Sequence, residues 1–270
     1  MALSVVDLYA RVLPRTNCKD CGYPTCIAFA GMVVSEKLAL KNCPHIHADI
    51  LLNAQKELEE QYKQGKWLKK DMAEEALEWA KQKTASMKME DIAGRIGGTF
   101  TGSGGDETIL VSCFNKQISI TRNGIRDDSG RDLSRNEQTF VYIHMARGGA
   151  SAPSGKMKSL KEFPNTISKI VSMRERVEIP LKNAFAANPQ SLSLSCENFG
   201  GVSVKNLYPS CDLAYEFKAF PKIPVVLLFW RATDGFEADA KLLFDETIIQ
   251  HLDIEAILFL SEHLCNMLIH

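Results

Sequence analysis

The sequence has no long hydrophobic run. Its longest apolar segment, residues 223–230, is interrupted by Pro224 and is far shorter than the roughly 20 residues of a membrane-spanning helix. The first residues also lack the basic and then apolar pattern of a secretion signal, because Asp7 and Arg11 fall within them. We therefore expect a cytoplasmic protein without a membrane span.

An excess of charge of either sign is also missing. The 32 Lys and Arg residues and 33 Asp and Glu residues leave a net charge of -1 over 270 residues. The chain therefore lacks the excess of basic residues that is typical of nucleic-acid-binding proteins. The hydrophobic share of 45% and charged share of 24% are ordinary for a folded protein and exclude extensive disorder. The length fits one large domain or two of average size.

Residue patterns predict a helical N-terminal part. A capping box from Ser4 to Asp7 starts a short helix that ends at Pro14, and residues 27–40 form an Ala-rich helix. Residues 56–91 contain eight Lys, nine Asp or Glu and one glycine. This composition predicts two solvated helices broken near that glycine. We expect them to carry one apolar stripe, formed by Leu68, Met72, Ala76 and Trp79.

The glycine-rich stretch of residues 94–105 predicts a domain boundary, and residues 97–105 within it predict a flexible linker. Beyond this stretch the pattern changes to short β-prone runs. A hairpin is expected around Asn115, and Ser134 opens a capping box for a helix to residue 147. Asp245 and Asp253 are predicted helix caps. The predicted strands are residues 108–114, 117–121, 191–195, 202–207, 214–217 and 225–230.

These elements predict a mixed α/β, or α+β, protein of three parts. Residues 1–60 would form a small helical cluster domain, residues 61–95 a charged helical connector, and residues 96–270 a larger α/β domain. We expect its sheet to be mainly antiparallel or mixed. The clearest strand, residues 225–230, is continuously apolar, which predicts burial on both faces.

Cysteine carries the chemical information. Four of the eight cysteines form the pattern Cys18-x2-Cys21-x4-Cys26-x16-Cys43, and in a reducing compartment such clustering indicates metal binding. Four thiolates suit a structural Zn²⁺ or an iron–sulfur cluster. Zinc ribbons use two Cys-x2-Cys pairs and this chain has one. Three ligands on one loop plus a distant cysteine followed by proline therefore favour a [4Fe–4S] cluster.

The same segment resembles a known module. The shared residues include Leu13-Pro14, Thr16-Asn17, Gly22-Tyr23-Pro24-Thr25, Ala28-Phe29-Ala30 and Cys43-Pro44, together with the four cysteines. Over roughly the first 45 to 60 residues it resembles the small [4Fe–4S] domain of the large subunit of corrinoid iron–sulfur proteins. It is also similar to the domain in the B subunit of ion-pumping ferredoxin:NAD oxidoreductases. The resemblance implies that Cys18, Cys21, Cys26 and Cys43 bind the cluster, and that the domain transfers single electrons at low potential.

The C-terminal part is similar to an uncharacterised domain family that is fused to this module in strict anaerobes. The resemblance lies in residues 153–156, 220–224, 229–245 and 252–255. The barrel and cobalamin-binding domains of corrinoid proteins are too long to fit in this chain. The resemblance therefore implies a cluster domain and leaves the second domain without an assigned activity.

Other residues have a functional and a structural interpretation. His144 is a possible axial ligand or a buried core histidine, and His45 and His47 flank the fourth cluster cysteine. Cys196 and Cys211 are half a metal site or core residues, whereas Cys113 and Cys265 are scattered and have no assigned role. In each case the structural interpretation is favoured. It is also favoured for a phosphate-loop-like segment at residues 149–157 and an acidic loop with Asp234, Glu237 and Asp239.

Three functions follow as hypotheses. The first is a low-potential electron-transfer protein with a redox partner protein, whose most specific role is the reductive activation of a corrinoid or another metallocofactor. The second is a cofactor-binding, trafficking or assembly module, with a corrinoid or other tetrapyrrole as ligand, in which the cluster is structural or senses redox state. The third is an enzyme with its active site in the second domain. No spacing in the sequence identifies a catalytic triad or a pair of catalytic carboxylates.

Overall fold

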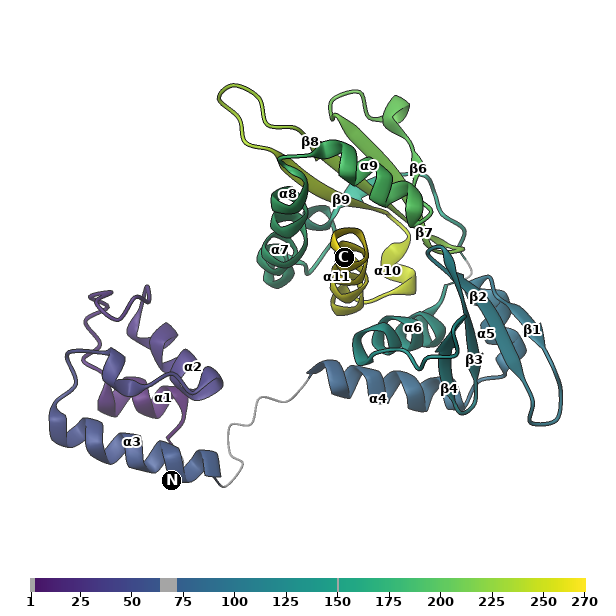
Figure 1. The fold of residues 1–270 in the computed structure, drawn as a ribbon. Coiled ribbons are helices and arrows are strands. Elements are labelled where there is room, and N and C mark those ends of the chain that lie inside the picture. Colours follow the sequence, from purple (N-terminus) through teal and green to yellow (C-terminus); the bar gives the residue numbers. More distant parts are fainter. Residues whose placement is uncertain (1–2, 64–71, 150) are drawn as a thin grey trace. The chain divides into compact units, whose positions relative to one another are not determined.

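The computed structural model describes residues 3–63, 72–149 and 151–270. The chain divides into two compact units, Met1–Asp71 and Met72–His270 (Figure 1). The predicted helix break near Gly65, and Leu68 of the predicted apolar stripe, lie outside the described residues. Within the described ranges, no helix combines the length and the apolar character that are needed to cross a bilayer.

The first unit is a small helical bundle. Helix α1 (Val5–Asp7) starts at the predicted Ser4 capping box and continues into a π-helical turn, Leu8–Val12. Helix α2 (Cys26–Glu36) ends where Lys37 adopts a left-handed φ of 55°, so it is shorter than the predicted residues 27–40. A 3-10 turn (Leu40–Asn42) and helix α3 (Ala48–Lys63) complete the unit.

Helices α4 (Met72–Ala85) and α5 (Met89–Ile96) belong to the second unit, although the sequence assigned residues 61–95 to a connector. Ile92 and Ile96 are buried in its core, which explains why α5 packs there. The predicted stripe is wrong at Trp79, because this side chain is 46% exposed and Lys83 lies 5.1 Å above its ring. Leu77 is buried on α4 instead.

A four-stranded antiparallel sheet follows α5. Its order is β1 (Thr99–Thr101), β2 (Thr108–Cys113), β3 (Lys116–Thr121) and β4 (Gly124–Asp127). The predicted hairpin is confirmed by the pairing of Cys113 with Lys116. The predicted linker is wrong, because Gly97 ends α5 with a φ of 80° and β1 follows at once. A Cβ atom at Gly98 would lie 2.7 Å from the Ile109 side chain, so this glycine allows close packing rather than flexibility.

The second sheet has the order β5-β9-β8-β7-β6, and all its neighbouring strands are antiparallel. The strands are β5 (Met157–Ser159), β6 (Val202–Ser203), β7 (Leu213–Phe220), β8 (Ile223–Trp230) and β9 (Asp239–Asp245). The predicted α+β class with a mainly antiparallel sheet is therefore confirmed. The predicted burial of β8 is confirmed too, because Phe229 belongs to the main core and Leu228 to a smaller cluster on the other face.

Helices cover one face of this sheet (Figure 1). They are α7 (Ile167–Met173), α8 (Ile179–Phe185), α9 (Pro189–Asn198) and α11 (Ile254–Ile269), and they share one core with α6 (Arg135–Arg147). The capping box at Ser134 and the cap at Asp253 are confirmed. A shorter helix, α10 (Ile248–His251), precedes α11.

One predicted strand of this unit is wrong, and another is longer than the strand observed. Residues 191–195 alternate Ser and Leu as a strand does, but they lie in α9, which begins at Pro189 and buries Leu192 and Cys196 four residues apart. Proline is favourable in the first turn of a helix, and this spacing places both residues on one face. Residues 202–207 form a two-residue strand and a 3-10 turn, Lys205–Leu207.

Candidate metal centre

The four cysteines of the N-terminal motif all lie in the first unit, where Cys26 and Cys43 share one buried cluster and Cys21 packs against it. Cys18 and Cys21 lie on the loop before α2, Cys26 is the first residue of α2, and Cys43 follows the 3-10 turn. Burial raises the pKa of the Cys43 thiol, and the proximity of Cys21, Cys26 and Cys18 raises it further. Four thiolates held together would repel one another unless a cation lay between them, so this donor set fits a thiolate-bound metal cluster.

The loop that carries the first ligands has a costly backbone conformation. Arg15, Asn17 and Lys19 have φ values of 60°, 53° and 69°, and Gly22 has 84°. A left-handed conformation costs a non-glycine residue about 1–2 kcal/mol. Such residues persist where their surroundings enforce them and cluster at functional sites. Three of them at alternate positions beside the thiols therefore indicate a loop shaped for binding.

Local hydrogen bonds hold this loop against α2. The Cys26 amide donates to Asn17 Oδ1 at 2.8 Å, and the Ala28 amide donates to Thr25 Oγ1 at 3.1 Å, which caps the helix. The Gly22 amide donates to the Lys19 carbonyl at 2.8 Å. The positive end of the α2 dipole therefore lies at Cys26, where it stabilises negative charge.

An apolar layer lies beneath the cysteines. Phe29 is fully buried and packs 5.8 Å from Tyr23, centroid to centroid, within a cluster that includes Cys26, Cys43 and Leu40. Cys18 is exposed and Cys21 is half-buried, whereas Cys26 and Cys43 are buried. The candidate ligands therefore span the boundary between the core and solvent, with Cys18 on the outer side.

A polar pair, Asp20 and His45, lies beside the cysteines, and its acidic member was not predicted from the sequence. His45 Nε2 lies 2.6 Å from Asp20 Oδ2, and donor atoms of Cys18, Asp20 and His45 lie within 4.8 Å of one another. The hydrogen bonds from His45 and then Cys18 lower the pKa of Asp20. His45 is recognisable in the sequence because it flanks the fourth cysteine. Asp20 lies 25 residues away from it, and no spacing rule connects the two residues. His47 is exposed at the start of α3.

The other four cysteines form no second cluster among the described residues. Cys196 and Cys211 are buried in different hydrophobic clusters, which agrees with the favoured core interpretation and not with the alternative half-site. Burial raises the pKa of the Cys113 thiol to about 12 and that of Cys265 to about 11, and it raises the pKa values of Cys196 and Cys211 as well. These thiols are core residues with little tendency to ionise.

One small cavity of the second unit combines nucleophile, base and acid. Cys113, His263 and Glu137 line a space of about 100 Å³, and His263 Nδ1 lies 3.8 Å from Glu137 Oε1. A cysteine nucleophile needs a depressed pKa. Burial and then the negative charge of Glu137 raise the pKa of Cys113 to about 12. The described residues therefore do not activate Cys113 for cysteine-type catalysis.

Two buried histidines contact each other in the same unit, with their ring planes tilted by 59°. His144 on α6 and His251 on α10 are fully buried, with ring centroids 5.3 Å apart. Burial lowers the pKa of His144 to about 3 and also lowers that of His251. His144 therefore fits the core interpretation and stays neutral at physiological pH.

The backbone amides of the phosphate-loop-like segment already bind a carboxylate of the protein itself. The amides of Ser154 and Gly155 donate to the Asp245 carboxylate at 3.1 and 2.7 Å. The same carboxylate accepts from the Thr247 amide at 2.9 Å. Asp245 therefore fixes two loops, whereas α10 has Thr247 as its N-cap residue, so the predicted cap at Asp245 is wrong.

Two segments match known families. Residues 13–45 match the family described as "Putative Fe-S cluster", and residues 88–267 match the family described as "Domain of unknown function (DUF3786)". No solved structure gives a significant match.

The similar curated proteins match only the N-terminal segment. The gamma subunit of the acetyl-CoA decarbonylase/synthase complex of Methanocaldococcus jannaschii is 45% identical over 42 residues, or 16% of this chain and 8% of that protein. The corrinoid/iron-sulfur protein large subunit of Moorella thermoacetica is 44% identical over 46 residues, or 17% and 10%. The chain thus covers a tenth or less of their length. Because the DUF3786 match spans more than half of the chain, the protein belongs to that family, and its N-terminus carries an iron–sulfur cluster domain.

Proposed function

We propose that Cys18, Cys21, Cys26 and Cys43 bind a [4Fe–4S] cluster and that the protein transfers single electrons to a partner protein. The observation that carries the proposal is that all four thiols lie in one small unit, where Cys26 and Cys43 are buried in the same hydrophobic cluster and Cys21 packs against it. Bound by four thiolates, such a cluster supplies one-electron redox chemistry. The family match at residues 13–45 supports an iron–sulfur cluster in this segment.

The surrounding residues suit this role. Thr25 and Asn17 hold the start of α2, so that helix dipole and amide groups favour the negative charge of the ligand set. Phe29 and Leu40 exclude water from the inner side, and a dry, hydrogen-bonded shell tunes the reduction potential. The Asp20–His45 pair adds a polar contact at the outer ligand, Cys18.

Exposure determines where electrons enter and leave. Cys18 is exposed and Cys26 and Cys43 are buried, so a partner would approach from the side of the Cys18 loop. The similar proteins are named as subunits of larger assemblies, which supports a protein partner here.

The most specific form of the proposal is that the electron reactivates a corrinoid or another metallocofactor held by that partner. The support is the similarity of the N-terminal segment to a protein named as a corrinoid/iron-sulfur protein large subunit. Since this chain covers 10% of that relative, the corrinoid would belong to the partner.

Metal analysis and a reduction assay test the proposal together. We expect anaerobically purified protein to contain about four iron and four sulfide per chain, and dithionite-reduced protein to reduce cob(II)alamin in a spectrophotometric assay. Cys26→Ser should lose both properties, whereas Cys196→Ser, a buried cysteine of the second unit, should keep both. Zinc in place of iron would contradict the cluster. A full cluster that reduces no acceptor would contradict electron transfer and favour the cofactor-binding or assembly role.

A further inference from the structure

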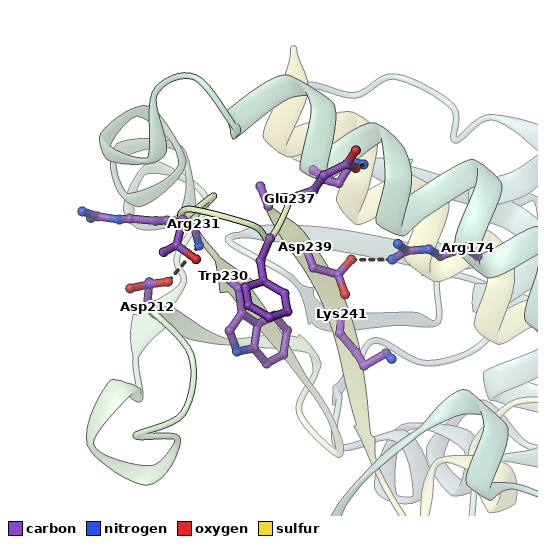
Figure 2. Close-up of a pocket in the computed structure, with 11 residues that line it drawn as sticks. Arg174, Asp212, Trp230, Arg231, Glu237, Asp239 and Lys241 are labelled. Carbon is purple, nitrogen blue, oxygen red and sulfur yellow. Dashed lines mark hydrogen bonds and ion pairs between the residues drawn. The ribbon is translucent and has the colours of Figure 1, made fainter.

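A cavity of about 520 Å³ opens beside the hairpin between β8 and β9 in the second unit. Its volume lies in the range of about 300–1,000 Å³ that small-molecule sites occupy. Figure 2 shows acidic and basic side chains around the indole of Trp230. The residues that matter here are Trp230, Phe236, Arg174, Lys182, Asp239 and Lys241.

Two aromatic rings line this cavity. The indole of Trp230 is oriented by its Nε1, which donates to the Ser210 carbonyl at 2.8 Å. Phe236 is 77% exposed although it lies on a tight turn, in which Thr233 and Phe236 exchange amide hydrogen bonds of 3.0 Å around Gly235. An exposed phenyl ring on a constrained turn, next to an oriented indole, offers flat faces to a conjugated ring.

Every carboxylate that lines the cavity already has a partner. Asp239 pairs with Arg174 at 2.5 Å (Figure 2), and Glu237 pairs with Lys182 at 2.8 Å. Asp212 accepts a hydrogen bond of 2.8 Å from the Arg231 amide. Two of the three carboxylates are therefore neutralised by ion pairs, and the third, Asp212, is held by a backbone amide.

Lys241 is different. Within the described ranges its amine makes no hydrogen bond and no ion pair within 4.0 Å. Burial raises the pKa of the nearby Glu178 carboxyl, and the positive charge of Lys241 opposes this rise. On β9 it pairs in register with Leu228, while Trp230 pairs with Asp239 two residues away. Residues two apart on a strand share a face, so Lys241 and Trp230 are diagonal neighbours on the same face of the sheet.

We infer that this cavity binds a mononucleotide-sized ligand that has a planar conjugated ring and a phosphate or carboxylate group. The ring lies against Trp230 and Phe236, and the anionic group binds the amine of Lys241. The site uses no residue of the first unit and is independent of the proposed cluster.

Binding of probe molecules to the full chain tests the inference. The probes are flavin mononucleotide and adenosine monophosphate, each compared by isothermal titration calorimetry with its nucleoside-type counterpart, riboflavin or adenosine, and with inorganic phosphate. We expect at least one phosphate-bearing probe to bind at least tenfold more tightly than its neutral counterpart, as one charge-assisted contact provides. Inorganic phosphate should bind weakly, because it has no ring.

Variants assign the two parts of the site. Lys241→Gln should remove the tenfold advantage of the phosphate-bearing probe, while Lys218→Gln, at the other end of the sheet face, should not. Phe236→Ala should weaken the charged and neutral probes equally, and its exposed position leaves folding intact. Trp79→Leu, at an exposed position of α4, is the aromatic control. Cys26→Ser should bind as the wild type does, which separates this site from the cluster proposal.

Two results would overturn the inference. One is the absence of binding of both mononucleotides at millimolar concentration to protein that is folded by circular dichroism. The other is binding that Lys241→Gln and Phe236→Ala leave unchanged, which would place the probe elsewhere.

Discussion

The two units are stabilised by different means. Among the described residues the first unit buries 13 apolar residues in its core, two of which are the candidate ligands Cys26 and Cys43, whereas the main core of the second unit contains 47. Of the six non-glycine residues with positive φ in the described parts of the chain, four lie in the smaller unit. Small domains with limited cores commonly need a metal or another staple. The comparison predicts that the first unit needs a bound metal cluster to stay folded, whereas the second unit does not.

Removal of a candidate cluster ligand should produce the largest difference in stability between the two units. In Cys43→Ser we expect the first unit to lose its fixed structure, because the free energy of metal binding is also the free energy of folding in such a domain. The second unit should remain folded. Limited proteolysis with mass spectrometry measures both, and cleavage should concentrate in residues 3–63. Equal protection of the two units in the variant would show that the first unit folds without its ligand.

Core truncation gives the next largest effect and a matched pair of variants. Phe29 and Phe229 are both fully buried, and replacing either by alanine costs about 3–5 kcal/mol. We expect Phe29→Ala to unfold the first unit and release iron, whereas Phe229→Ala lowers the urea midpoint of a second unit that still folds. Hydrogen exchange resolves the two units. If Phe29→Ala retained both iron and protection, the small core would not be marginal.

Acid should affect the second unit through His144. Because burial lowers the pKa of His144 to about 3, the folded unit keeps this ring neutral while the unfolded chain binds a proton near pH 6.5. Stability should therefore fall as pH decreases from about 6.5 towards 3, by up to about 1.4 kcal/mol per pH unit for this group. His251, whose pKa is lowered as well, acts in the same direction.

Urea unfolding at pH 7 and pH 5 measures this slope. We expect His144→Phe to reduce it, while His47→Phe in the first unit, where the side chain is exposed, should leave it unchanged. A slope that His144→Phe does not alter would show that other groups control the acid sensitivity.

The ligand loop gives the smallest effect. Lys19→Gly relieves a positive φ of 69° and should slow the loss of the cluster in air by an amount that corresponds to about 0.5–1 kcal/mol. Lys56→Gly, at an exposed position inside α3, should instead speed the loss of the cluster, because glycine destabilises a helix interior by about 1 kcal/mol. Bleaching of the cluster absorption gives both rates. Faster bleaching of Lys19→Gly would show that the loop is not strained.

Sequence patterns predicted best where one local rule decides the structure. The capping boxes at Ser4 and Ser134 and the buried strand β8 each have a nearby cause, and all three are confirmed. Residues 191–195 failed because their Ser–Leu alternation also fits a helix that buries Leu192 and Cys196. The spacing of the cysteines indicated a metal site. Asp20, which meets His45 only in the folded loop, could not be found from spacing.

The central claim is a redox-active cluster held by Cys18, Cys21, Cys26 and Cys43, and electron paramagnetic resonance tests it most directly. The account predicts that anaerobically purified protein gains a spin-half signal on reduction with dithionite. The signal should persist in Cys196→Ser and disappear in Cys26→Ser. A spectrum that stays silent after reduction, in protein that contains zinc rather than iron, would contradict the account.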